Sequence, residues 1–164
     1  MCGILAVVGK YRYTEVPKAL IERGRDGNGI FENEHVQLIQ TRLHITGEKK
    51  VLPFQTDKYV LLFNGEIYNY KDYANCEYQA ILNAFKQGKL KELDGQFAII
   101  IYNKITNKMT IALDELRINS LVYTNHENSL IIASNIRSLP NIKIENINLK
   151  GYGNVSNSKF LWPF

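Results

Sequence analysis

Two continuous apolar runs limit what this chain can fold into more than any other feature. Residues 59–63 and 97–102 are apolar or aromatic throughout, and the second run holds three consecutive isoleucines. Short runs of this composition favour strands over helices. A strand that is apolar on both faces is buried on both faces. The sequence therefore predicts a layered domain whose sheets are covered on two sides.

The rest of the chain predicts further strands and two helices, without internal repeats. Residues 77–87 carry apolar side chains at helical spacing, and residues 16–23 form a shorter helix candidate that glycines interrupt. The further strands are predicted at 4–8, 36–40, 109–113 and 130–133. Few helices and many strands predict an α+β layered domain.

The hydrophobic pattern ends near residue 150. We therefore expect one domain over residues 1–150 and a tail over residues 151–164, rich first in Gly, Asn and Ser and then in aromatic residues. The aromatic end could anchor a partner protein, or it could fold back and cover the domain's own sheet edge or a helix.

Composition narrows the functional classes. The chain is 45% hydrophobic and 22% charged, which is ordinary for a globular protein. The net charge is +4, but the lysines are spread along the chain, so a solvated surface is favoured over a nucleic-acid site. Two cysteines and three scattered histidines indicate no disulfide framework, no metal site and no cofactor. Without a signal segment or a long apolar run, we expect a cytoplasmic protein, away from membranes.

Cys2 is the first candidate catalytic residue. Removal of Met1 would leave Cys2 at the terminus, with a thiol and an α-amine on one residue. Such an amine titrates at about pH 8, so it can accept the thiol proton and later protonate a leaving group. A cysteine at this position can also be incidental.

Asn64 and Gly65 follow directly after the apolar run at 59–63. An asparagine amide and a glycine N–H at a strand end can converge on one oxygen atom, as an oxyanion hole requires. The alternative is a tight hairpin turn, which Asn-Gly strongly favours. Arg42 follows the strand predicted at 36–40 and could bind a carboxylate through two hydrogen bonds, or it could lie on the surface.

These signals belong to a series of short blocks. In chain order the blocks are CGI (2–4), RGRDG (23–27), RLHI (42–45), NGEIYN (64–69), LDGQFA (93–98), DELRI (114–118) and ASNI (133–136). The series resembles the class II glutamine amidotransferase domain, and within that class the glutaminase half of glutamine-dependent asparagine synthetase. The resemblance covers residues 2–139 and depends most on the NGEIYN block and the N-terminal cysteine.

The resemblance implies a fold and a reaction. The fold is the N-terminal-nucleophile hydrolase fold, a four-layer αββα sandwich with two stacked antiparallel sheets. The reaction converts glutamine to glutamate and ammonia through a thioester on Cys2, whose own α-amine is the base. Asn64 and the Gly65 N–H would form the oxyanion hole, and Arg42 would bind the α-carboxylate of glutamine. The residues that would frame the pocket are Glu66 and, through their backbone, Leu43 and Ile45.

Two positions depart from the family pattern. Glu77 stands where the family has an aspartate that binds the α-amino group of glutamine, which keeps the charge and adds one methylene. Leu113 stands where the family commonly has an arginine at the contact with an acceptor domain. No phosphate-binding glycine loop follows residue 149, so we expect the ammonia to reach a separate acceptor protein, a synthetase or a transferase.

Two other functions remain open. A catalytically degraded glutamine-binding or interaction module would account for Glu77 and Leu113, whereas the retained Cys2 and Arg42 favour activity. A terminal-nucleophile hydrolase that acts on another amide is the second alternative.

Overall fold

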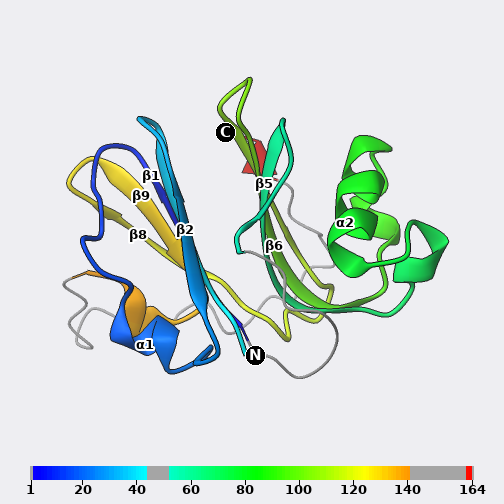
Figure 1. Cartoon of the computed structure of the whole chain (residues 1–164), viewed down its shortest axis with the longest axis horizontal. Helices are drawn as coiled ribbons and strands as arrows, with labels where there is room; N and C mark the ends of the chain where they lie inside the picture. Colours follow the sequence, from blue (N-terminus) through cyan, green and yellow to red (C-terminus); the bar gives the residue numbers. More distant parts are fainter. Residues whose placement is uncertain (1, 44–51, 141–161, 164) are drawn as a thin grey trace.

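The computed structural model describes residues 2–43, 52–140 and 162–163. Two antiparallel five-stranded sheets lie face to face, with one helix on the outer side of each sheet (Figure 1). The order of layers is α1, first sheet, second sheet, α2. The predicted α+β sandwich of four layers is therefore confirmed.

The first sheet has the strand order β2-β3-β1-β9-β8. Its central strand, β1, begins almost at the N-terminus and pairs with β3 on one side and β9 on the other. The strands are β1 (Gly3–Val8), β2 (Asn28–Glu32), β3 (Val36–Thr41), β8 (Val122–His126) and β9 (Ser129–Ala133).

The second sheet has the strand order β10-β7-β6-β5-β4. The long strands β5 and β6 form its middle and pair along their whole length. The strands are β4 (Phe54–Gln55), β5 (Tyr59–Ile67), β6 (Gly95–Asn103), β7 (Lys108–Leu113) and β10 (Trp162–Pro163).

Apolar side chains fill three layers, which explains the two continuous apolar runs. In β5, Val60 and Leu62 lie between the two sheets, whereas Leu61 and Phe63 face the outer layer under α2. The longer helix α2 (Glu77–Lys86) covers that outer face. On the other side of the molecule, Leu20 of α1 (Lys18–Ile21) packs against the first sheet. Three short 3-10 helices complete the described elements: η1 (Tyr70–Asp72), η2 (Leu90–Glu92) and η3 (Ile136–Ser138).

The elements predicted from the sequence are present, and two strands of the first sheet were missed. β2 and β8 alternate between exposed and partly buried residues and carry few apolar side chains, so they lack the apolar signal of the buried strands. The predicted helix at 16–23 is confined to the four residues of α1. In the tail, Trp162–Pro163 pairs with β7 at the edge of the second sheet, which is one of the two places expected for it.

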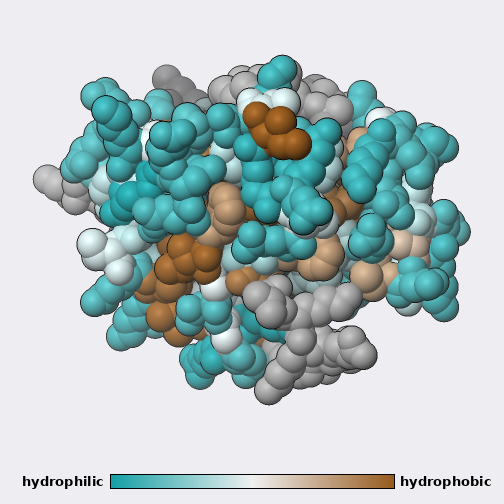
Figure 2. Space-filling view, turned by 45° about the horizontal axis from the view of Figure 1, so that its top comes forward, coloured by the Kyte–Doolittle hydropathy of each residue, from teal (hydrophilic) through white to brown (hydrophobic). Residues whose placement is uncertain are grey.

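The surface is polar over most of its area. Hydrophilic residues predominate on the face shown in Figure 2, and hydrophobic residues gather in a few places. Within the described residues, no helix combines the length and the apolar character that crossing a membrane requires.

Candidate active site

Cys2 and Arg42 lie side by side at one end of the first sheet. Gly3 pairs with Thr41 in the register of β1 and β3, so the residues just outside this pair, Cys2 and Arg42, are also neighbours. The Gly3 N–H donates to Thr41 Oγ1 at 3.0 Å, and Arg23 Nε donates to the Cys2 carbonyl oxygen at 3.4 Å. Cys2 is a partly buried free thiol at this sheet end.

The segment 23–27 runs along the same end of the sheet. Its Asp26 N–H donates to the Arg42 carbonyl oxygen at 2.9 Å, and the Arg42 N–H donates to the Gly27 carbonyl oxygen at 2.8 Å. This segment, the RGRDG block of the sequence, therefore lies beside Cys2 and Arg42.

Asn64 and Gly65 lie inside β5 and not in a hairpin turn. The strand continues to Ile67, and Gly65 lies opposite Phe97 of β6. The tight-turn alternative is therefore wrong. Gly65 has φ of 134°, and a β-carbon at this position would collide with the carbonyl oxygen of Gln96. The strand can pass this point only with glycine.

The backbone N–H of Gly65 stays outside the pairing of β5 with β6. Phe97, opposite it, donates its N–H to Asp114 Oδ2 at 3.0 Å and accepts from the Asp114 N–H at 3.0 Å. Both backbone groups of Phe97 therefore point away from β5, and Gly65 belongs to a non-hydrogen-bonded pair. Two residues on, Ile67 directs its N–H to Glu77 Oε1 at 2.8 Å. The Gly65 N–H points to that same side of β5.

A buried hydrogen bond joins the two sheets next to Asn64. Gln40 of β3 donates its Nε2 to the carbonyl oxygen of Phe63 at 2.7 Å, and Gln40 pairs with Ile4 of β1. The end of the first sheet that carries Cys2 is thereby connected to β5 at the residue before Asn64. The Asn64 side chain is itself buried, and its Nδ2 donates to Asn119 Oδ1 at 2.9 Å.

Glu77 lies at the start of α2, on the side of β5 to which the Gly65 N–H points. Burial is the main cause that raises the pKa of Glu77, and the neighbouring charge of Glu66 raises it further. The hydrogen bond from the Ile67 N–H acts in the opposite direction. Two carboxyl groups next to each other form an environment that favours a cationic ligand. Glu66 itself is exposed.

Tyr78 is a residue that sequence reasoning did not assign to the site. Its ring stacks on Phe54 with centroids 5.2 Å apart and meets Phe63 edge-on at 5.7 Å. Burial raises the pKa of Tyr78 to about 12, with the charge of Cys2 adding to the shift and the charge of Arg42 opposing it. The hydroxyl, which also shares a side-chain hydrogen bond with Gln40, feels both charges and stays protonated at neutral pH.

The helical period of α2 explains why Tyr78 was read only as part of an apolar stripe. The stripe is real, because Ile81 and Leu82 are fully buried under the second sheet. Tyr78 lies one turn earlier, at the start of the helix, where its hydroxyl reaches the site. Its position directly after Glu77 is the signal that could have identified it.

The two framing residues predicted after Arg42 are Leu43 and Ile45. Leu43 is exposed and follows Arg42 at the end of the first sheet. Ile45 lies outside the described residues.

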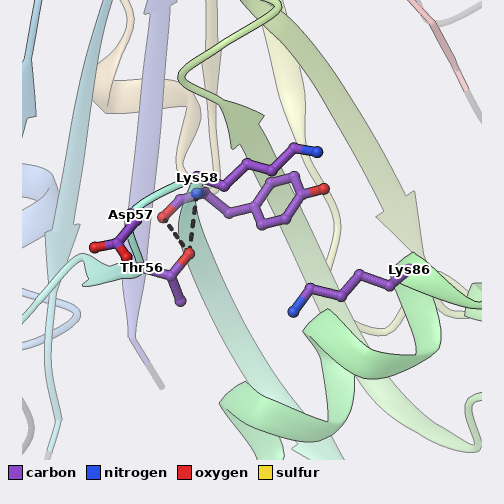
Figure 3. Close-up of a pocket in the computed structure, with 5 residues that line it drawn as sticks. Thr56, Asp57, Lys58 and Lys86 are labelled. Carbon is purple, nitrogen blue, oxygen red and sulfur yellow. Dashed lines mark hydrogen bonds between the residues drawn. The ribbon is translucent and has the colours of Figure 1, made fainter.

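A surface hollow lies away from this site. It has a volume of about 510 Å³ and is lined by Thr56, Asp57, Lys58, Tyr59 and Lys86 (Figure 3). The Lys58 and Lys86 ammonium groups lie 5.5 Å and 6.0 Å from the centre of the Tyr59 ring. Tyr59 begins β5, whereas Asn64 and Gly65 lie near its other end, so the hollow is separate from the candidate active site.

Sequence comparisons agree on one family. Residues 1–157 match the profile of a family described as "Glutamine amidotransferase domain". The asparagine synthetase [glutamine-hydrolyzing] 1 of Bacillus subtilis is 28% identical over 167 residues, which cover 85% of this chain and 26% of that protein. A putative asparagine synthetase of Methanocaldococcus jannaschii is 27% identical, with 85% of this chain and 33% of that protein covered. The chain thus spans a third or less of these relatives.

Structure comparison agrees on the fold. The glutamine phosphoribosylpyrophosphate amidotransferase of B. subtilis matches with a TM-score of 0.60 at 18% identity, covering 81% of this chain and 42% of that chain. A structure described as the allosteric regulatory enzyme of purine biosynthesis matches with a TM-score of 0.63 at 17% identity. The matching part is the two-sheet sandwich of the N-terminal-nucleophile hydrolase type.

Proposed function

Because this chain belongs to the family of glutamine amidotransferase domains, we propose that it hydrolyses the side-chain amide of glutamine through a thioester on Cys2. The observation that carries the proposal is the junction of the two sheets at Gln40 and Phe63. This junction connects the sheet end with Cys2 and Arg42 to β5 at the residue before the buried Asn64, and the next residue, Gly65, turns its N–H away from β6.

The chemical steps follow from the proposed roles. After removal of Met1, the α-amine of Cys2 takes the thiol proton, and the thiolate attacks the amide carbon of glutamine. Asn64 Nδ2 and the Gly65 N–H donate to the oxygen that becomes negatively charged. The α-ammonium then gives its proton to the NH2 group of the intermediate, and the C–N bond breaks to release ammonia. Water hydrolyses the γ-glutamyl thioester to glutamate and restores the thiol.

The two charged groups on the α-carbon of glutamine are matched by opposite charges around the site. Arg42 is suited to the α-carboxylate, because a guanidinium can form two parallel hydrogen bonds with it. Glu77, together with Glu66, is suited to the α-ammonium. The hydroxyl of Tyr78, on which the charges of Cys2 and Arg42 act, is suited to contact the α-carboxylate of the substrate. Leu43 and Ile45 keep their proposed role in framing the pocket.

The ammonia would serve an acceptor enzyme. The names of these relatives describe glutamine-hydrolysing synthetases, of which this chain covers 26% and 33%. We propose a synthetase or transferase on a separate chain as the acceptor. Co-purification of such an enzyme, and ammonia transfer to its product from ¹⁵N-amide glutamine, would test this part.

A comparison of the two cysteines tests the nucleophile. Cys2→Ala should abolish ammonia release and leave the melting temperature unchanged, because the residue precedes β1 and is only partly buried. Cys76→Ala is the matched control, since Cys76 is the other partly buried free thiol and lies at the N-cap of α2. Intact mass should show loss of Met1 and, after quenching with acid, a glutamyl adduct on Cys2.

Three outcomes would overturn the proposal. The first is ammonia release by Cys2→Ala, and the second is full activity of a population that keeps Met1. The third is a wild-type protein that binds glutamine in calorimetry but releases no ammonia, which would identify a binding module.

A further inference from the structure

The oxyanion-hole assignment leads to one more residue, which no sequence motif indicated. We infer that Asn119 is a positioning residue for the proposed reaction: it holds the Asn64 amide so that one N–H of Asn64 faces the developing oxyanion. This inference deepens the proposed function and rests on it.

The geometry at Asn64 leaves one donor for the substrate. Asn64 and Asn119 are 1% and 4% exposed, and the Asn64 Nδ2 donates to Asn119 Oδ1 at 2.9 Å. A carboxamide nitrogen carries two N–H groups, so this bond uses one and leaves the other. If the Asn64 amide turned over, its oxygen would face the oxygen of Asn119 and no donor would face the substrate. Asn119 therefore fixes which atom of Asn64 points into the site.

Asn119 is held by the carboxylate of Asp114. Asp114 Oδ2 accepts from the Asn119 N–H at 3.3 Å and from the Phe97 N–H at 3.0 Å, and Asp114 Oδ1 accepts from the Ile118 N–H at 3.0 Å. Phe97 is the residue opposite Gly65. The same buried carboxylate thus holds the backbone of Asn119 and draws the backbone of Phe97 away from Gly65, so it acts next to both proposed donors.

Hydrogen bonds, and not apolar packing, hold the segment between Asp114 and Asn119. Leu116 and Ile118 are 80% and 58% exposed. Arg117 adopts a left-handed conformation with φ of 53°, which is unfavourable for a residue with a β-carbon, and its N–H donates to the Asp114 carbonyl oxygen at 3.1 Å. The bend at Arg117 therefore gains nothing from burial of its neighbours Leu116 and Ile118. Its structural result is to bury Asn119 at the end of the segment.

Kinetics of Asn119→Ala test this role. We expect kcat for glutamine hydrolysis to fall by about 10- to 100-fold, because a misplaced group costs this much without being removed, while KM changes by less than about twofold because the ground-state contacts remain. Asn83→Ala is the matched control: it also removes one side-chain hydrogen bond, from Asn83 Nδ2 to the Tyr73 carbonyl oxygen at 3.0 Å, but on α2. It should leave kcat unchanged.

A double-mutant cycle with Asn64→Ala separates positioning from a general structural effect. If Asn119 acts through Asn64, Asn119→Ala should lower kcat by less than about twofold in the Asn64→Ala background. Thermal melts show whether each variant folds, and Asn119→Leu, which keeps the side-chain volume, replaces Asn119→Ala if the latter does not fold.

The results that would overturn the inference are distinct from those that would overturn the proposed function. A wild-type protein that releases no ammonia contradicts the function. An active wild type with unchanged kcat in Asn119→Ala and Asn119→Leu contradicts only the role of Asn119. An equal loss in the presence and absence of Asn64 contradicts it as well.

Discussion

Replacing Glu77 by Gln tests the proposed ammonium pocket with little disturbance of the fold. The glutamine side chain keeps an oxygen that can accept from the Ile67 N–H, as Glu77 Oε1 does at 2.8 Å. The pKa of Glu77 is raised in the fold, chiefly by burial. A carboxyl group with a raised pKa adds stability below its unfolded pKa, and that stability is lost as the pH rises through the folded pKa. At neutral pH, Glu77→Gln should therefore melt no lower than the wild type.

The expected effect falls on substrate binding. A hydrogen bond to a charged group contributes about 1.5–3 kcal/mol, and each 1.4 kcal/mol is about tenfold in affinity. KM for glutamine should therefore rise by about 10- to 150-fold, while kcat changes less. The wild type should also show a rise in KM as the pH falls, beginning above the ordinary pKa of a glutamate, because the carboxyl group must be ionised to bind the ammonium. Glu77→Gln should lack this pH dependence.

The assay is steady-state ammonia release over a pH series, with glutamate measured in parallel. Glu66→Gln serves as a second variant: it removes a like charge, which lowers the pKa of Glu77 and should move the rise in KM to lower pH. Glu15→Gln, at an exposed position, is the control. A KM for Glu77→Gln within about twofold of the wild type at neutral pH would refute the ammonium pocket.

Three further predictions concern the other parts of the site. Asn64→Ala should lower kcat by about 100- to 1000-fold, whereas Arg42→Ala should mainly raise KM, and the opposite pattern in steady-state kinetics would contradict both roles. Gly65→Ala should lower stability by at least about 1–3 kcal/mol, because its β-carbon meets the Gln96 carbonyl, and an unchanged thermal melt would contradict this. Tyr78→Phe keeps the ring contacts and should raise KM by about two- to tenfold through loss of one hydrogen bond; an unchanged KM would show that the hydroxyl does not contact glutamine.

The buried strands could be predicted from the sequence more fully than the site, for physical reasons. The buried strands carry their own signal, because Val60 and Leu62 face one apolar layer while Leu61 and Phe63 face another. Asn64-Gly65 was ambiguous, since the same dipeptide suits a tight turn and a strand that passes close to a carbonyl group. Only the pairing with β6 decided for the strand.

The contacts that define the site could not be predicted from local sequence patterns. Asn64 and Asn119 are 55 residues apart in the chain, and nothing near either residue indicates the other. Tyr78 looked like one more apolar residue of a helix. The helical spacing of apolar residues indicates which face of a helix is buried, but it does not indicate which side-chain atom contacts a neighbouring sheet. The ends of the strands and the short polar strands β2 and β8 were set by pairing, which the sequence does not display.

The central position of β1 has a consequence for how the protein is made. Its partner β9 lies more than 120 residues further along, and Ile4 also donates its N–H to Ser134 Oγ at 3.0 Å. During synthesis β1 leaves the ribosome first and cannot pair with β9 until most of the chain has been made. Contacts this distant in sequence also form slowly. A chain that ended before Ser129 would leave β1 as an open sheet edge, where it could pair with another chain. The strand that follows the proposed nucleophile can thus complete its pairing only after β9 has been synthesised.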